Sequence, residues 1–178
     1  NRALLARAQA QGRMLESNLR VQRLISQRHP VDEILQAITD EACALLGSDL
    51  VGIQLDAPGM PGSSAISTSG DVGRRLLDTL PTQELIRFGR QAAAGELDAP
   101  RLVALPVVGE AAVPITVYGS PVRNNGVSMG GLFLMRPADV EADRHIDTAA
   151  VETFAGQASI ALTDASTVHE LHHAFHDT

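Results

Sequence analysis

The sequence predicts an α+β domain, in which an antiparallel sheet is flanked by a long helix at each end. Two observations support this fold class. Residues 2–27 and 141–177 have the composition and spacing of long helices. Between them, Asn124-Asn125-Gly126 separates two strand-like runs, and Asn-Gly favours the type I′ turn of a β-hairpin. Strands joined by such a hairpin are antiparallel, and 178 residues suffice for one domain with flanking helices.

The N-terminal part of the chain is predicted to form two helices. Residues 2–27 contain one glycine and no proline, and their apolar side chains form a stripe too narrow for a domain core but typical of a coiled-coil seam. That stripe consists of Leu5, Ala8, Leu15, Leu19 and Gln22. Pro30 ends this helix, and a broad apolar face over residues 31–46 predicts a second helix that Gly47 caps.

The rest of the chain alternates between strand and helix signals. Apolar runs bounded by turn residues predict strands at residues 49–56, 63–69, 102–108, 113–122 and 127–135. Leucine-rich spacing predicts helices over residues 71–97, with Pro81 between them. The last two strands carry apolar side chains at both parities, so we expect both faces of the sheet to be largely covered.

Composition excludes several function classes. The net charge of −7 and a pI near 5.3 argue against nucleic-acid binding. No apolar run approaches the length of roughly 18 residues that a membrane helix needs, so we expect no membrane contact by these residues. Cys43 is the single cysteine, which excludes an intrachain disulfide, fits a cytoplasmic protein, and is best read as a buried, inert thiol.

Three segments resemble the GAF domain family. They are Val31–Leu55 at the opening, and Gly130–Met135 and Phe154–Leu162 at the close. The resemblance covers residues 30–163 and implies a GAF-like antiparallel sheet with helices packed on one face and a small-molecule pocket on the other. It also implies a non-catalytic sensory role in a bacterial signalling protein. Residues 1–29 would then be an N-terminal signalling and dimerisation helix, and residues 164–178 a linker helix.

The end of the chain resembles the lead-in to a GGDEF domain, the catalytic unit of diguanylate cyclases. The segment concerned is His172-His173-Ala174-Phe175-His176-Asp177-Thr178. This resemblance implies a covalently linked C-terminal effector that makes cyclic di-GMP. The alternatives are a histidine kinase or serine phosphatase effector, or a ligand-free dimerisation spacer.

One motif favours a different chemistry. His169-Glu170-Leu171-His172-His173 matches the H-E-x-x-H pattern of zinc peptidases, which places two histidines four residues apart on one helix face. Such a site also needs a third ligand and a cleft, and only His176, Asp177 and Thr178 remain after the motif as possible ligands. A solvated, histidine-rich linker helix is the simpler interpretation, so we expect no metal, no cofactor and no catalytic residue.

The C-terminal helix also carries a heptad pattern. Apolar or small residues recur with 4-3 spacing from Phe154 to Phe175, which predicts a helix–helix seam. Together with the N-terminal stripe, it predicts a parallel homodimer. The predicted interface residues are Leu5, Leu15, Leu19, Ala161, Ala165, Val168 and Phe175.

The hairpin register predicts the wall of a ligand pocket. If Asn125-Gly126 is the two-residue loop, Tyr118 opposes Phe133 and Thr116 opposes Met135 on one sheet face. A small-molecule pocket prefers an apolar wall with a few polar groups, which this face offers. The predicted ligand-binding residues are Thr116, Tyr118, Ser120, Phe133, Met135 and Phe88. The alternative is an ordinary core in which Tyr118 finds one hydrogen-bond partner.

Overall fold

The sheet has five strands, all paired antiparallel, in the order β2–β1–β5–β4–β3. The structure is a computed structural model that describes residues 2–55, 63–107, 110–124, 126–138 and 148–176. The strands are β1 (Leu50–Leu55), β2 (Ser63–Thr68), β3 (Arg101–Val107), β4 (Glu110–Asn124) and β5 (Val127–Pro137). The predicted α+β class with an antiparallel sheet is therefore confirmed.

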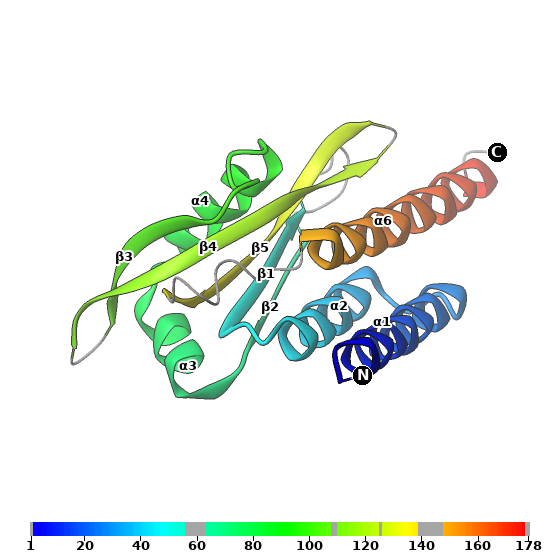
Figure 1. Ribbon diagram of the computed structural model, residues 1–178. Coiled ribbons are helices and arrows are strands. Elements are labelled where there is room, and N and C mark those ends of the chain that lie inside the picture. The colour runs from blue at the N-terminus through cyan, green and yellow to red at the C-terminus, as the bar shows by residue number, and fades with distance from the viewer. Residues whose placement is uncertain (1, 56–62, 108–109, 125, 139–147, 177–178) are drawn as a thin grey trace.

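Helices cover both faces of this sheet (Figure 1). The helices are α1 (Arg2–Ser26), α2 (Val31–Leu46), α3 (Gly70–Thr79), α4 (Thr82–Ala93) and α6 (Thr148–His176). We name the side that carries α1, α2 and α6 the terminal-helix face, and the side that carries α3 and α4 the α4 face. The resemblance implied helices on one face and a pocket on the other, but two helices also pack on that second face, in keeping with the apolar side chains at both parities.

Two backbone features fix the ends of α2. Pro30 precedes its first turn with an extended backbone, and the chain turns out of its last turn at Gly47, where φ is 60° and ψ is 33°. That left-handed conformation suits glycine, which has no Cβ to clash. The predicted start and cap of this helix are therefore confirmed.

The two terminal helices share one layer. The second half of α1 packs into the domain, with Val21 and Ile25 buried. The Gln157 side chain of α6 donates a hydrogen bond of 2.8 Å to Oδ1 of Asn18 on α1. Figure 1 shows α1 and α6 running in the same direction, with the N- and C-terminal ends of the chain at opposite ends of this layer. Four leucines along the other side of α1 remain exposed: Leu4 63%, Leu5 60%, Leu15 60% and Leu19 53%.

On the α4 face, glycines bring the helix backbone against the sheet. A Cβ added at Gly131 of β5 would lie 2.5 Å from the carbonyl oxygen of Gly89 and 2.6 Å from Cβ of Ala92, both on α4. A Cβ added at Gly89 would meet Gln54 of β1 at 2.6 Å. Such distances are shorter than real carbon contacts, so only glycine permits this approach of α4 to β1 and β5.

A β-bulge in β5 changes the register of the hairpin. Asn124 pairs with Val127, which fits the predicted two-residue loop, but the register shifts between the pairs Arg123–Ser128 and Val122–Gly130. Met129 is the extra residue of this bulge. Tyr118 consequently opposes Leu134, and Gly119 opposes Phe133. The predicted pairing of Tyr118 with Phe133 and of Thr116 with Met135 is wrong, because one inserted residue moves every later side chain of β5 to the other face.

Candidate functional site

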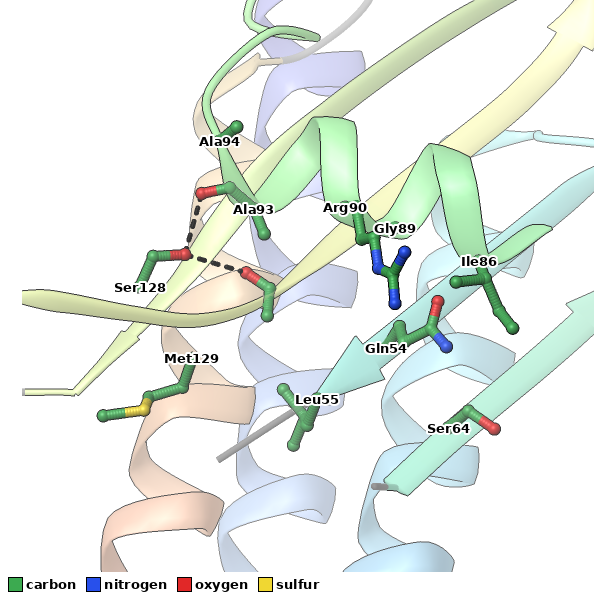
Figure 2. Close-up of a pocket in the computed structure, with 11 residues that line it drawn as sticks. Gln54, Leu55, Ser64, Ile86, Gly89, Arg90, Ala93, Ala94, Ser128 and Met129 are labelled. Atoms are coloured by element: carbon green, nitrogen blue, oxygen red, sulfur yellow. Dashed lines mark hydrogen bonds between the residues drawn. The ribbon is translucent and has the colours of Figure 1, made fainter. Parts of the chain in front are cut away.

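A groove of about 550 Å³ lies between α4 and the edge of the sheet (Figure 2). Its volume lies within the range of small-molecule sites, roughly 300–1,000 Å³. Strands β1, β2 and β5 form its floor and α4 forms one wall. The lining residues are Gln54, Leu55, Ser64, Ile86, Gly89, Arg90, Ala93, Ala94, Ser128, Met129 and Gly130.

The groove combines apolar walls with a few polar groups. Arg90 is its only charged side chain among these lining residues, and Figure 2 shows Arg90 and Gln54 extending into it from α4 and β1. The hydroxyl of Ser128 lies 2.7 Å from the carbonyl oxygen of Ala93 and 3.4 Å from that of Gly130. Ser128 therefore ties the end of α4 to the bulge of β5 at the border of the groove.

The interior of the α4 face is filled rather than hollow. Phe88 and Phe133 are 1% and 2% exposed, and their ring centroids lie 6.1 Å apart. Beside them remains a cavity of about 60 Å³, to which Phe133, Gln54 and Ile86 contribute. This cavity holds at most a few waters, so an organic ligand would have to use the larger groove.

The structure divides the six predicted ligand residues between the two sheet faces. Tyr118 belongs to the buried cluster of the terminal-helix face, whereas Phe88, Phe133 and Met135 belong to that of the α4 face. The prediction of a single pocket wall is therefore wrong, and the bulge at Met129 is the physical reason. None of the six, Thr116, Tyr118, Ser120, Phe133, Met135 and Phe88, lines the groove, and only Phe133 reaches the small cavity beside it.

Sequence reasoning missed the groove residues, although one signal was present. Gly89 lies inside a helix and Gly130-Gly131 inside a strand, and both positions predict close backbone packing. Polar residues beside those glycines, Arg90 and Ser128, would then have been the candidates at the edge of the contact.

The hairpin that borders the groove also contacts α6. Ser159 of α6 donates a hydrogen bond to the carbonyl oxygen of Arg123, and the hydroxyl of Thr163 donates one of 2.9 Å to Oδ1 of Asn124. Arg123 and Asn124 pair with Ser128 and Val127 on the other arm of the hairpin. One arm of the hairpin therefore lines the groove, and the other arm is bonded to the C-terminal helix.

Burial raises the pKa of two side chains on the terminal-helix face. Burial is the main cause for Tyr118, with smaller contributions from Glu152 and Asp98, while a hydrogen bond with Thr148 lowers the pKa. Cys43 is 4% exposed, and burial, Asp49 and Asp40 raise the pKa of its thiol. The thiol donates to the carbonyl oxygen of Ser48 at 3.1 Å. A thiol held in its neutral form is a poor nucleophile, and the prediction of a buried Cys43 is confirmed.

The predicted dimer residues divide into three groups. Leu5, Leu15 and Leu19 are exposed on α1. Ala161 is 1% exposed and belongs to the core of its own chain, so its place in a dimer interface was predicted wrongly. The helical period brings its methyl group to the side of α6 that packs on the domain. The side chains of Ala165, Val168 and Phe175 lie outside the described residues.

Two further sequence expectations concern metals and membranes. The backbone of His169–His173 is helical within α6, but the side chains of this motif also lie outside the described ones. Among the side chains that are described, no group of three or more His, Cys, Asp or Glu residues could hold a metal ion. Within the same part of the chain, none of the helices combines the length and the apolar character needed to cross a bilayer.

Solved structures share this arrangement of sheet and helices. The GAF domain of a putative sensor histidine kinase from Pseudomonas syringae pv. tomato aligns with a TM-score of 0.60 at 20% identity, covering 94% of this chain and 97% of that one. The phycoerythrobilin-bound GAF domain of a cyanobacterial phytochrome aligns with a TM-score of 0.54 at 18% identity, covering 88% and 98%. The GAF domain of a phosphoenolpyruvate-protein phosphotransferase from Acinetobacter gives 0.51 at 19%, covering 86% and 95%.

At identities of 20% or less, these structures show that the fold is shared. The family is shown by a comparison of the sequence alone. None of the curated proteins matches the chain. The sequence model of the GAF domain, however, matches residues 30–162, from the start of α2 to the buried part of α6. The matched range contains the sheet, helices α2, α3 and α4, and the groove. The chain therefore belongs to the GAF domain family.

Proposed function

We propose that this chain is a non-catalytic sensory domain, in which a small molecule bound in the groove changes the position of α6 and thereby controls a linked output domain. The hairpin formed by β4 and β5 carries this proposal. Its β5 arm lines the groove at Ser128 and Gly130, and its β4 arm is hydrogen-bonded to Ser159 and Thr163 of α6. A ligand shifts an equilibrium only if it contacts the two states differently, and this hairpin offers such a contact.

The family supports a small-molecule role. The GAF domain of a cyanobacterial phytochrome holds phycoerythrobilin, so the fold accommodates an organic ligand. The chain here offers a groove of about 550 Å³, which is large enough for a small metabolite.

A thermal-shift screen tests ligand binding. A compound present at 100 times its Kd stabilises the folded state by about 2.7 kcal/mol, which raises the Tm of a domain of this size by several degrees. Ser64→Trp, on the exposed rim of the groove in β2, should abolish the shift. Leu102→Trp, at a 66% exposed position of β3, is the matched control and should retain it.

A ligand-free dimerisation spacer is the second candidate, and the filled interior of the α4 face favours it. Phe88 and Phe133 occupy the space where an enclosed pocket would lie, and only about 60 Å³ remains. If no compound in a library of neutral, cationic and anionic metabolites shifts the Tm, the spacer replaces the sensor.

The proposed output domain is a GGDEF diguanylate cyclase, because His172–Thr178 resembles the lead-in to that domain. In the full-length protein, a groove ligand should change the rate at which GTP is converted to cyclic di-GMP. Asp164→Pro interrupts α6 beyond the matched region, so it should preserve ligand binding and remove the response. Phosphotransfer or phosphatase activity in place of cyclase activity would assign a histidine kinase or serine phosphatase instead.

The proposed assembly is a parallel homodimer. The leucines of α1 at positions 5, 15 and 19 are exposed in the single chain and lie on the helix that shares a layer with α6. Light scattering should give about twice the chain mass of 18.8 kDa. Leu5→Glu combined with Leu15→Glu should halve the measured mass, while Leu102→Glu on β3, equally exposed, should leave it unchanged. A monomeric wild-type chain would contradict this assembly.

A further inference from the structure

The charge of the groove restricts what it binds. Among the described residues that line it, Arg90 is the only charged one and none is a carboxylate. The neighbouring hollow on α4 shares Arg90 and Ile86 and adds Arg87 and Gln83, again without a carboxylate. The chain as a whole carries a net charge of −7, so the surroundings of Arg90 contrast with the average surface. A negatively charged group would meet attraction here and repulsion over most of the molecule.

Arg90 differs from the arginine one turn before it. Arg87 forms an ion pair of 2.8 Å with Glu84 on the same helix. For Arg90, the described residues provide neither a carboxylate nor a hydrogen-bond acceptor for the guanidinium. Within the described part of the chain, its five N–H donors are therefore left for solvent or a ligand, in a planar fork that matches a carboxylate.

Gln54 supplies a second polar group from the opposite side. Its side chain lies against the backbone of α4, because only the lack of a Cβ at Gly89 leaves room for it. The side chain is half-buried, and its amide has no hydrogen-bond partner within the described part of the chain. Gln54 and Arg90 thus present unpaired donors from β1 and α4 to the same groove (Figure 2). Leu55, Ile86 and Met129 supply the apolar surface around them.

We infer that the groove takes an organic monoanion with an apolar body, whose carboxylate-type group binds Arg90 and Gln54 while its body packs on Leu55, Ile86 and Met129. This inference rests on the proposed sensory function and specifies the chemical class of its ligand. One guanidinium and one amide match a single negative charge. A dianion would leave its second charge without a partner.

A matched pair of probes tests this class. 1-Naphthoate and its neutral analogue 1-naphthamide differ in charge but hardly in shape, and backbone amide shifts of Gly89 and Gly130 in NMR titrations report binding in the groove. Naphthoate should bind more tightly than naphthamide, and Arg90→Gln should weaken naphthoate roughly tenfold, as expected for a hydrogen bond to a charged group. The affinity for naphthamide should be the same in the Arg90→Gln variant as in the wild type.

Arg87→Gln is the control variant, since it removes the same charge three residues away from a side chain already paired with Glu84. It should leave the naphthoate affinity within about twofold of the wild type, because Arg87 does not line the groove and its charge is already paired with Glu84. An equal loss in both variants would assign the effect to the general potential of α4 and overturn the role of Arg90. A more than tenfold preference for 1-naphthyl phosphate over naphthoate would overturn the monoanion class.

The failure of this inference is distinguishable from failure of the sensory proposal. If neutral compounds shift the Gly89 and Gly130 resonances while naphthoate does not, the groove binds ligands but not anions. If no compound of any charge shifts these resonances or the Tm, both proposals fail together.

Discussion

The two faces of the sheet are covered by helices in physically different ways. On the terminal-helix face, large side chains fill the interface, and Phe154, Leu35 and Ile38 are each fully buried. On the α4 face, the helix backbone approaches the strands at Gly89 and Gly131, and the large side chains lie to one side of that contact. The first interface continues into both ends of the chain, whereas the second leaves a groove at its edge.

Because of this difference, we expect the terminal-helix face to hold the helices in place and the α4 face to contain the groove. An interface made of interlocking side chains has few alternative arrangements, so it suits the face that holds α1 and α6 in register. An interface made through glycine backbones has an abrupt edge, where α4 ends and the bulge of β5 begins. The groove lies at this edge, and the hairpin connects it to the other face.

The largest effects are expected from truncating one buried phenylalanine on each face, which tests whether the two faces are independent. Phe154→Ala and Phe88→Ala should each lower the free energy of unfolding by about 3–5 kcal/mol, measured by urea denaturation. Phe88→Ala removes the neighbour of Phe133 beside the small cavity and should also change the naphthoate affinity of the groove. Phe154→Ala should not. Equal changes in affinity for the two variants would mean that the faces are not independent.

Adding one methyl group to a glycine gives opposite results at two positions. Gly131→Ala places a Cβ 2.6 Å from Cβ of Ala92, so α4 must move away from β5, and we expect a loss of about 1–3 kcal/mol. Gly156→Ala on α6 meets no atom within 4 Å and should stabilise the helix by roughly 0.5–1 kcal/mol. Thermal unfolding should show a lower Tm for Gly131→Ala and a higher Tm for Gly156→Ala than for the wild type. A stabilised Gly131→Ala protein would show that α4 is not tightly seated.

The link between the faces is tested by removing its hydrogen bonds. Ser159→Ala and Thr163→Val each remove one bond from α6 to the hairpin, at a cost of about 1 kcal/mol. Hydrogen exchange at Arg123 and Asn124 should accelerate, and groove ligands should lose their effect on α6. Thr153→Val is the control, since its hydroxyl bonds only to Ala149 within α6. If hydrogen exchange in the hairpin stays unchanged, these hydrogen bonds do not link the groove to α6.

Asp49, between α2 and β1, gives the smallest expected effect. Burial raises the pKa of its carboxyl above the ordinary value of 3.8, and Arg136 offsets this only in part. The folded protein therefore holds this proton at pH values where the unfolded chain has lost it, so the contribution of Asp49 to stability declines as pH rises through that window. Asp49→Asn should remove this decline. Urea unfolding of both proteins at pH 4 and pH 7 measures the difference, and parallel pH profiles would contradict it.

Local sequence rules predicted most of the elements. Pro30 and Gly47 bound α2, alternating apolar residues predicted β1, and Asn125-Gly126 predicted the hairpin loop. These signals are local, because backbone restriction and side-chain alternation act within a few residues. The long terminal helices α1 and α6 were also predicted, from their composition and spacing.

The site was not predictable in this way, because it depends on pairing between distant segments. The bulge at Met129 reverses the faces of all residues that follow, and nothing in the alternation of β5 indicates it. The groove requires Gly89 of α4 to meet Gln54 of β1, a contact across 35 residues. Thr116, Tyr118 and Ser120 were therefore predicted as ligand residues from their polarity alone. The observed pairing of β4 with β5 places them on the terminal-helix face or beside it.

The parallel course of α1 and α6 means that a domain fused to the end of α6 would be oriented by the direction and rotation of that helix (Figure 1). Each residue of a helix advances about 1.5 Å and turns about 100°. Deleting one residue from α6 after Thr163 would therefore reorient everything beyond it by nearly a third of a turn, whereas deleting seven would restore the orientation to within about 20°. The output of a fused domain should then oscillate with linker length, with a period of seven residues.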